Sequence, residues 1–261
     1  MRFPARLTAG ARLSVGLLTV VPVGAVRAER DQAGTAIRCA PLVGAGLGAG
    51  VGLAAWGLGE LGTSTLITGI VAVALFAALT RGLHLDGLAD TADGLGSRKD
   101  PEGALAVMKA SDIGPFGVLS ILFAALLQCG AAATLLARGP DHHAVALFAL
   151  AAATARIPVV WACRAGLPAA RPDGLGALVG GTVSGAAAAV WAGTALWVAA
   201  LIGLWTDVGA ARAVIAVGLA LLAAGALLEH CRRRFGGMTG DVLGALVETA
   251  MTVGLVVLST T

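Results

Sequence analysis

The chain has 261 residues, of which 57% are hydrophobic and only 13% carry a charged side chain. Its mean hydropathy is +0.88, and a soluble domain of this size needs far more charge to cover its surface. This composition, with a net charge of only +3, excludes a soluble enzyme, a nucleic-acid-binding module and a disordered chain. It predicts an all-α, polytopic membrane bundle.

The first 36 residues precede the first long apolar run. Three arginines followed by the apolar stretch Leu13–Val26 imitate a signal peptide. Pro22 and Gly24 interrupt that stretch, and no clean small-residue cleavage site follows it. We therefore expect residues 1–36 to form a cytoplasmic segment that is interfacial or re-entrant, rather than a cleaved signal.

Seven apolar runs are close to the length of about 20 residues that a helix needs to cross a bilayer. They occupy Ile37–Leu58, Thr63–Thr80, Ile113–Ala137, Ala144–Cys163, Val183–Trp205, Gly209–Leu228 and Val242–Leu258. Alanine, glycine and leucine dominate these runs, and small residues allow helices to approach closely. The sequence predicts one compact domain over residues 1–261, with about seven spans in a lipid bilayer.

The basic residues are distributed unevenly between the two sides that these spans define. Fifteen of the 18 Lys and Arg residues fall in four segments, residues 1–38, 81–112, 164–182 and 230–241. Two fall in the segments on the other side, and Arg156 lies inside a span. Because positively charged loops tend to remain in the cytoplasm, we expect the four basic segments to face it.

An acidic motif follows the second apolar run. Asp86, Asp90 and Asp93 lie within eight residues, and their spacings of four and three place them on one face of a helix. Like charges beside a bilayer repel one another, and Mg²⁺, which prefers oxygen ligands and often shares its shell with substrate phosphates, would offset the repulsion. A solvated loop with acidic turn residues is the alternative. His84 is a candidate base, a phosphate contact or an interfacial side chain.

Basic residues follow the acidic motif at once. Arg98, Lys99 and Lys109 could neutralise phosphate oxygens, although a cytoplasmic membrane loop carries such residues for topology alone. Asp112 belongs to a Ser-Asp-Ile-Gly-Pro segment, which is typical of a helix cap followed by proline in the first turn. Asp112 also lies on the side of the acidic motif, so it remains a candidate for substrate binding.

Two further places carry charged residues inside or beside a span. Arg156 lies within an apolar run, where an ionisable group is costly and is a functional candidate by default. Asp241 opens the last span after a glycine-rich basic segment, and Glu248 lies seven residues later on the same helical face. A helix cap at Thr239 or Asp241 is the alternative to a binding role, and the role of Glu248 stays open.

Several of these segments together resemble one family. They are His84–Gly94, Ala106–Lys109, Asp112–Gly117, Thr154–Pro158 and Gly237–Gly244. In this combination the chain is similar to the cobalamin synthases, which are also called adenosylcobinamide-GDP ribazoletransferases. Pro115 and Met238 depart from the pattern expected of that family, and neither is an obvious ligand.

The resemblance implies a magnesium-dependent enzyme of the cell membrane whose active site faces the cytoplasm. It implies that adenosylcobinamide-GDP and α-ribazole, or its 5′-phosphate, give adenosylcobalamin or its phosphate and GMP, late in cobalamin biosynthesis. The expected catalytic residues are His84, Asp86, Asp90, Asp93 and Lys109, with the three aspartates on the metal. The expected substrate-binding residues are Arg98, Lys99, Asp112, Arg156 and Asp241. Either His84 or a carboxylate would accept the proton of the attacking hydroxyl.

Three other functions use similar features. A CDP-alcohol phosphotransferase also uses an aspartate-rich motif to bind a nucleotide diphosphate through metal ions. A membrane prenyltransferase usually has two separated aspartate-rich motifs, whereas this chain has one motif and the later Asp241. A secondary transporter tends to place ionisable groups at the bilayer midplane and to show inverted repeats, and no repeat is visible in the sequence.

Overall fold

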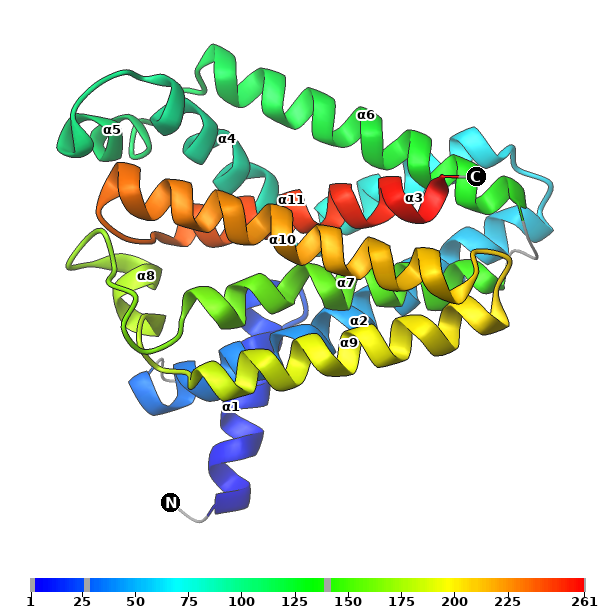
Figure 1. Cartoon of the computed structure of the whole chain (residues 1–261), viewed down its shortest axis with the longest axis horizontal. Coiled ribbons are helices and arrows are strands. Elements are labelled where there is room, and N and C mark those ends of the chain that lie inside the picture. The colour runs from blue at the N-terminus through cyan, green and yellow to red at the C-terminus, as the bar shows by residue number, and fades with distance from the viewer. Residues whose placement is uncertain (1–2, 26–28, 139–141, 261) are drawn as a thin grey trace.

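The computed structural model of the chain describes residues 3–25, 29–138 and 142–260. Within these residues every element longer than an isolated bridge is a helix (Figure 1). The helices are α1 (Phe3–Leu18), α2 (Arg30–Glu60), α3 (Thr65–Leu79), α4 (Leu83–Gly96), α5 (Pro101–Val107), α6 (Pro115–Arg138), α7 (His143–Ala162), α8 (Gly174–Val179), α9 (Gly185–Trp205), α10 (Ala210–Phe235) and α11 (Gly240–Ser259). The prediction of an all-α bundle is confirmed.

Six of the described helices are long and apolar enough to cross a membrane, namely α2, α6, α7, α9, α10 and α11. The pair α3 and α4 passes the same test together, although the two helices are bent by 87°. A count of six or seven agrees with the sequence prediction. The run Thr63–Thr80, however, does not form a full span by itself, because α3 has only 15 residues.

The break between α3 and α4 has a local cause. Arg81 and Gly82 adopt the left-handed conformation, with φ of 57° and 67°, which a right-handed helix does not contain. The Thr80 hydroxyl donates to the carbonyl of Phe76 at 2.8 Å and closes the last turn of α3. The acidic helix α4 therefore leaves in a new direction, toward the end of the bundle that holds α5 (Figure 1).

Helix connections gather at the two ends of the bundle (Figure 1). One end holds α5, α8, the turn between α10 and α11, and the start of α2. The connections α2–α3 and α9–α10 lie at the opposite end. The basic segments 81–112, 164–182 and 230–241 therefore lie toward one end of the molecule. That this end faces the cytoplasm stays a prediction.

Glycines set the closest helix contact in the bundle core. Gly44, Gly48 and Gly52 recur at every fourth residue of α2, and each faces the backbone of α7 between Ala144 and Ala152. A Cβ atom at any of the three would overlap α7 backbone atoms. This packing is the close approach that small residues allow in membrane bundles.

The N-terminal helix α1 runs across the bundle rather than along it, and it packs against α2 (Figure 1). Beyond its last turn, the amide of Val20 donates to the carbonyl of Leu79 at 2.8 Å. The guanidinium of Arg81 donates to the carbonyl of Gly16 at 3.2 Å. These bonds hold the end of α1 beside the α3–α4 break, and hence beside the start of the acidic helix.

Candidate active site

The acidic motif forms a helix, as its spacing predicts. α4 begins after Gly82, whose left-handed backbone starts the helix in its new direction, and it contains Asp86, Asp90 and Asp93. It packs against α11 and α6. The acidic helix therefore packs beside two of the apolar helices and is not a solvated loop, although the side chain of Asp86 is exposed.

A glycine-to-glycine crossing brings α4 and α11 together. A Cβ atom on Gly87 would lie 2.6 Å from the carbonyl oxygen of Asp241, and one on Gly244 would lie 3.2 Å from the Cα atoms of Gly87 and His84. The contact at Gly87 leaves no room for a Cβ atom, and a Cβ atom at Gly244 would require the backbone of α4 to shift by a few tenths of an ångström. Asp241 thus lies beside the acidic helix, although about 150 residues of chain separate the two.

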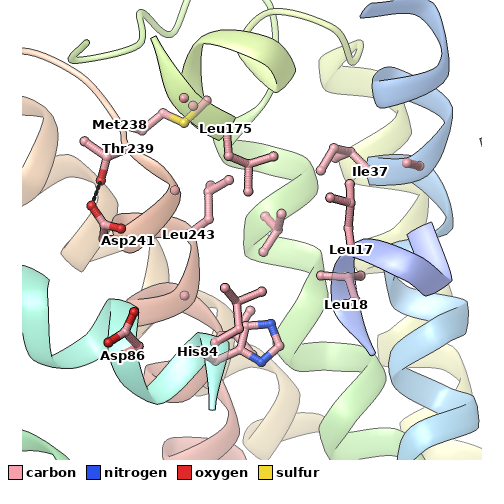
Figure 2. A pocket seen from close by; sticks show the side chains of 18 of the residues that line it. Leu17, Leu18, Ile37, His84, Asp86, Leu175, Met238, Thr239, Asp241 and Leu243 are labelled. Carbon is pink, nitrogen blue, oxygen red and sulfur yellow. Dashed lines mark hydrogen bonds between the residues drawn. The ribbon is translucent and has the colours of Figure 1, made fainter. Parts of the chain in front are cut away.

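A cavity of about 270 Å³ opens beside this crossing. Residues from α1, α2, α4, α7, α8 and α11, with the loop before α8, line it. Asp86 and Asp241 lie on one side, and Leu17 and Ile37 lie on the other (Figure 2). The cavity thus combines a carboxylate rim with an apolar wall.

Negative charge exceeds positive charge around the rim. An ionised Asp90 is repelled by Asp86, Asp241 and Asp93, and Arg171 is the cation that attracts it. Arg171 also lies 3.5 Å from Asp241, measured from Nη1 to Oδ2. Lys109 also attracts Asp241 electrostatically. Two cations do not neutralise four carboxylates, so the cluster attracts further cations.

The donors fit Mg²⁺ in their chemistry. Among the described residues, no three His, Cys, Asp or Glu side chains are close enough together to hold one ion. Mg²⁺ does not need such a cage, since it is usually bound by one or two carboxylates, waters and substrate phosphates. Asp86 and Asp241 both line the cavity, so their hard oxygens are available to an ion that arrives with a phosphate.

Asp93 has a structural task that the sequence does not reveal. Its Oδ2 accepts the amide of Gly114 at 2.7 Å, and its Oδ1 accepts the amide of Gly117 at 2.9 Å. Asp93 therefore caps the start of α6, a position for which the local pattern suggests Asp112. A role of Asp93 on the metal stays a prediction, because each of its oxygens keeps only its remaining lone pair for an ion.

The predicted basic residues do not converge on one point. Lys109 lies 3.5 Å from Asp173, one of the residues that line the cavity, and both side chains are exposed. Lys99 and Asp112 line a separate, shallower hollow beside Asp93. Arg98 is exposed and lines neither hollow.

Arg171 is a residue at the rim that sequence reasoning missed. It lines the cavity, and its Nη2 donates to the carbonyl of Leu105 at 2.7 Å while Nη1 faces Asp241. It thereby joins the loop before α8 to α5 and α11. The only sequence signal for it is its position in a basic segment, which topology alone explains.

The charged residues inside the bundle form a second polar group. Arg156 is only 2% exposed, donates to the carbonyl of Ala152 at 3.1 Å, and is attracted electrostatically by Glu248. Glu248 accepts a hydrogen bond of 2.8 Å from Gln128, which also donates to Thr252 at 2.9 Å. Arg156 does not line the cavity, so its predicted contact with substrate gains no support from the geometry.

Comparison with known proteins identifies the family. The family model for cobalamin-5-phosphate synthase matches residues 10–259. An adenosylcobinamide-GDP ribazoletransferase of Frankia casuarinae is 40% identical over 96% of this chain and 94% of its own length. Proteins of the same name from a Nocardioides species and from Allorhizobium ampelinum are 41% and 36% identical, over 92% and 89% of this chain and 93% and 89% of their own lengths. No solved structure matches the chain significantly. The chain belongs to the cobalamin-5-phosphate synthase family.

Proposed function

We propose that this chain is a membrane transferase that joins adenosylcobinamide-GDP to α-ribazole or its 5′-phosphate and releases GMP. The observation that carries the proposal is the carboxylate rim of Asp86 and Asp241 beside a cavity, in a chain that matches the family over residues 10–259. One substrate of this reaction is a nucleotide diphosphate, which is the kind of group that metal-binding carboxylates serve.

The reaction exchanges the phosphoanhydride bond of the diphosphate for a phosphate ester bond. A hydroxyl oxygen of α-ribazole forms a bond to the phosphorus on the cobinamide side, while the bond from that phosphorus to the bridging oxygen breaks. GMP leaves with the electron pair, and the hydroxyl proton passes to His84 or to a rim carboxylate. Both candidates line the cavity where the hydroxyl would have to lie, which supports either assignment.

We assign Asp86 and Asp241, which both line the cavity, to hold Mg²⁺ together with waters and substrate phosphates. Asp90 and Asp93, which the sequence also suggests as ligands, add negative charge to the same cluster. The bound ion supplies charge neutralisation for the diphosphate. Lys109 and Arg171 carry positive charge at the same rim and would hold phosphate oxygens. Arg98 is exposed and Arg156 is buried away from the cavity, so neither is assigned to bind phosphate.

We propose that the rim faces the cytoplasm of the cell. The support is the distribution of basic residues, with 15 in the segments of this side and two on the other. Cysteines introduced at Ser97 and Ser111 should react with a membrane-impermeant reagent only from the cytoplasmic side of sealed vesicles. Reaction from the outside alone would overturn both the orientation and the route by which a GDP-linked substrate reaches the site.

The activity is tested with the purified full chain in liposomes and with defined substrates. Addition of adenosylcobinamide-GDP, α-ribazole and Mg²⁺ should release GMP and form the joined corrinoid in equal amounts. GMP release that does not depend on α-ribazole would identify a hydrolase. An absence of both products, with a folded protein, would refute the proposed reaction.

A further inference from the structure

The wall of the cavity below its carboxylate rim is apolar. Leu17 and Leu18 come from α1, Ile37 from α2, Val159 from α7 and Leu243 from α11. In Figure 2, Leu17, Leu18 and Ile37 face Leu243 and His84 across the space. Side chains of four helices thus build an apolar chamber beside His84 of α4, and water makes few hydrogen bonds with such a surface.

One polar side chain in this chamber is buried without a hydrogen-bond partner among the described residues. Ser14 is 1% exposed, and its Oγ atom makes no hydrogen bond. His84 is 4% exposed and lies across the space from Leu17 and Leu18 (Figure 2). Both Ser14 and His84 line the cavity. Because a buried polar group without a partner is costly, a ligand that supplies a hydrogen-bond partner would account for the Ser14 hydroxyl.

We propose that this chamber, lined by Ser14, Leu17, Ile37 and His84, receives the heterocyclic base of α-ribazole while the corrinoid stays outside the rim. The inference rests on the proposed function, since it divides the two substrates of that reaction between two places. A planar, uncharged bicyclic ring fills an apolar wall, and its free ring nitrogen is one hydrogen-bond acceptor for Ser14 or His84.

Size and polarity exclude the other groups that the reaction brings to the site. Ligand pockets for drug-sized molecules hold about 300 to 1,000 Å³, so a cavity of about 270 Å³, of which the chamber is a part, accommodates a small bicyclic ring and not a corrin macrocycle. Guanine carries donors and acceptors along most of its edge, and the apolar wall offers it only Ser14 and His84 as polar side chains. Burying guanine there would leave several of its own polar atoms unsatisfied.

The same arrangement orders the reacting groups. With the base held between α1 and α11, the attached sugar lies toward Asp86 and Asp241, which border the same cavity. The attacking hydroxyl then meets the diphosphate at the rim. This assigns to the N-terminal helix α1 a direct part in holding substrate, through Ser14, Leu17 and Leu18.

The test uses the full chain in lipid nanodiscs and compares three variants. Leu17→Trp fills the chamber, Ser14→Ala removes only the unpartnered hydroxyl, and Val20→Trp places the same bulk on a residue that is 45% exposed and outside the cavity. Leu17→Trp should raise the KM for α-ribazole by at least about 100-fold and leave the KM for adenosylcobinamide-GDP within about twofold. Ser14→Ala should raise the KM for α-ribazole about fivefold, and Val20→Trp should change neither constant.

Two further measurements keep the outcome decisive. Free dimethylbenzimidazole should compete with α-ribazole for binding to the wild-type protein, whereas guanosine should not. Competition by guanosine, or a Leu17→Trp variant that loses the corrinoid substrate instead, would overturn the assignment. If Leu17→Trp fails to fold, an unchanged α-ribazole affinity in Ser14→Ala together with no competition by the free base would overturn it. Equilibrium binding of α-ribazole without the second substrate tests the chamber even where no GMP is released, so a failure of the proposed reaction is seen separately.

Discussion

Replacement of Asp93 by asparagine separates the structural role of the acidic motif from its chemical role. Both carboxylate oxygens of Asp93 accept backbone amides at the start of α6, at 2.7 and 2.9 Å. An asparagine side chain keeps one acceptor oxygen and places an NH₂ group, which is a donor, against the second amide. Asp93→Asn therefore leaves one buried amide without a partner and removes a negative charge from a helix N-terminus.

The size of the effect follows from these two losses. A hydrogen bond to a charged group contributes about 1.5 to 3 kcal/mol, and a charge at a helix N-terminus about 0.3 to 1 kcal/mol. Relief of the repulsion between Asp93 and Asp90 offsets a small part. We expect Asp93→Asn to lower the free energy of unfolding by about 2 to 3 kcal/mol. Asp86→Asn breaks no hydrogen bond within the described residues and should change it by less than about 0.5 kcal/mol.

The assay is reversible unfolding in mixed micelles, with amide hydrogen exchange as a local readout. Exchange at Gly114 and Gly117 should accelerate roughly 30- to 160-fold in Asp93→Asn, if these amides exchange through opening of the α6 start. The same amides should be unaffected in Asp86→Asn. Equal stability of the two variants, with unchanged exchange at both glycines, would refute the capping role of Asp93.

Three other outcomes follow from the site. Asp86→Asn and Asp90→Asn should each lower the rate of GMP release by at least about 100-fold. Asp100→Asn should leave the rate nearly unchanged, because Asp100 caps α5 by accepting the amide of Gly103 at 3.0 Å and asparagine caps a helix equally well. Similar rates in all three variants would refute the metal assignment. Chelation of Mg²⁺ should stop GMP release reversibly and leave α-ribazole binding intact, and full activity in the chelator would contradict the proposed chemistry. Gly87→Ala should lower the free energy of unfolding by about 1 to 3 kcal/mol and the activity at least about tenfold, because the alanine Cβ atom has no room against α11. Wild-type values in a thermal melt and a rate assay would show that the close crossing of α4 and α11 is not needed for stability or activity.

Local sequence patterns were sufficient to predict the fold class and some of the residues of the site. The apolar runs predict the bundle because a span needs only length and apolar composition, and both are properties of a continuous segment. The spacing of Asp86, Asp90 and Asp93 predicts one helical face because helix periodicity is also local. The clustering of basic segments at one end follows from the alternation of spans.

The tertiary structure decided which of these residues act together. Asp93 caps α6 from a different helix, 21 and 24 residues before the amides that it accepts, and a local reading of the segment assigns that cap to Asp112. Arg171 reaches Asp241 only because the loop before α8 folds over α11. Such contacts join segments that are far apart in the chain, and nothing in the sequence of either segment specifies its partner.

The cavity likewise exists only in the folded chain. Ser14 and His84 are unremarkable as single residues, and they come to line one cavity because α1 crosses the bundle beside the α3–α4 break. That break depends on two left-handed residues, Arg81 and Gly82, of which arginine gives no sequence signal for this conformation. The sequence determined the helices and the kind of chemistry, while helix packing determined the distances, and distances decide which groups share a site.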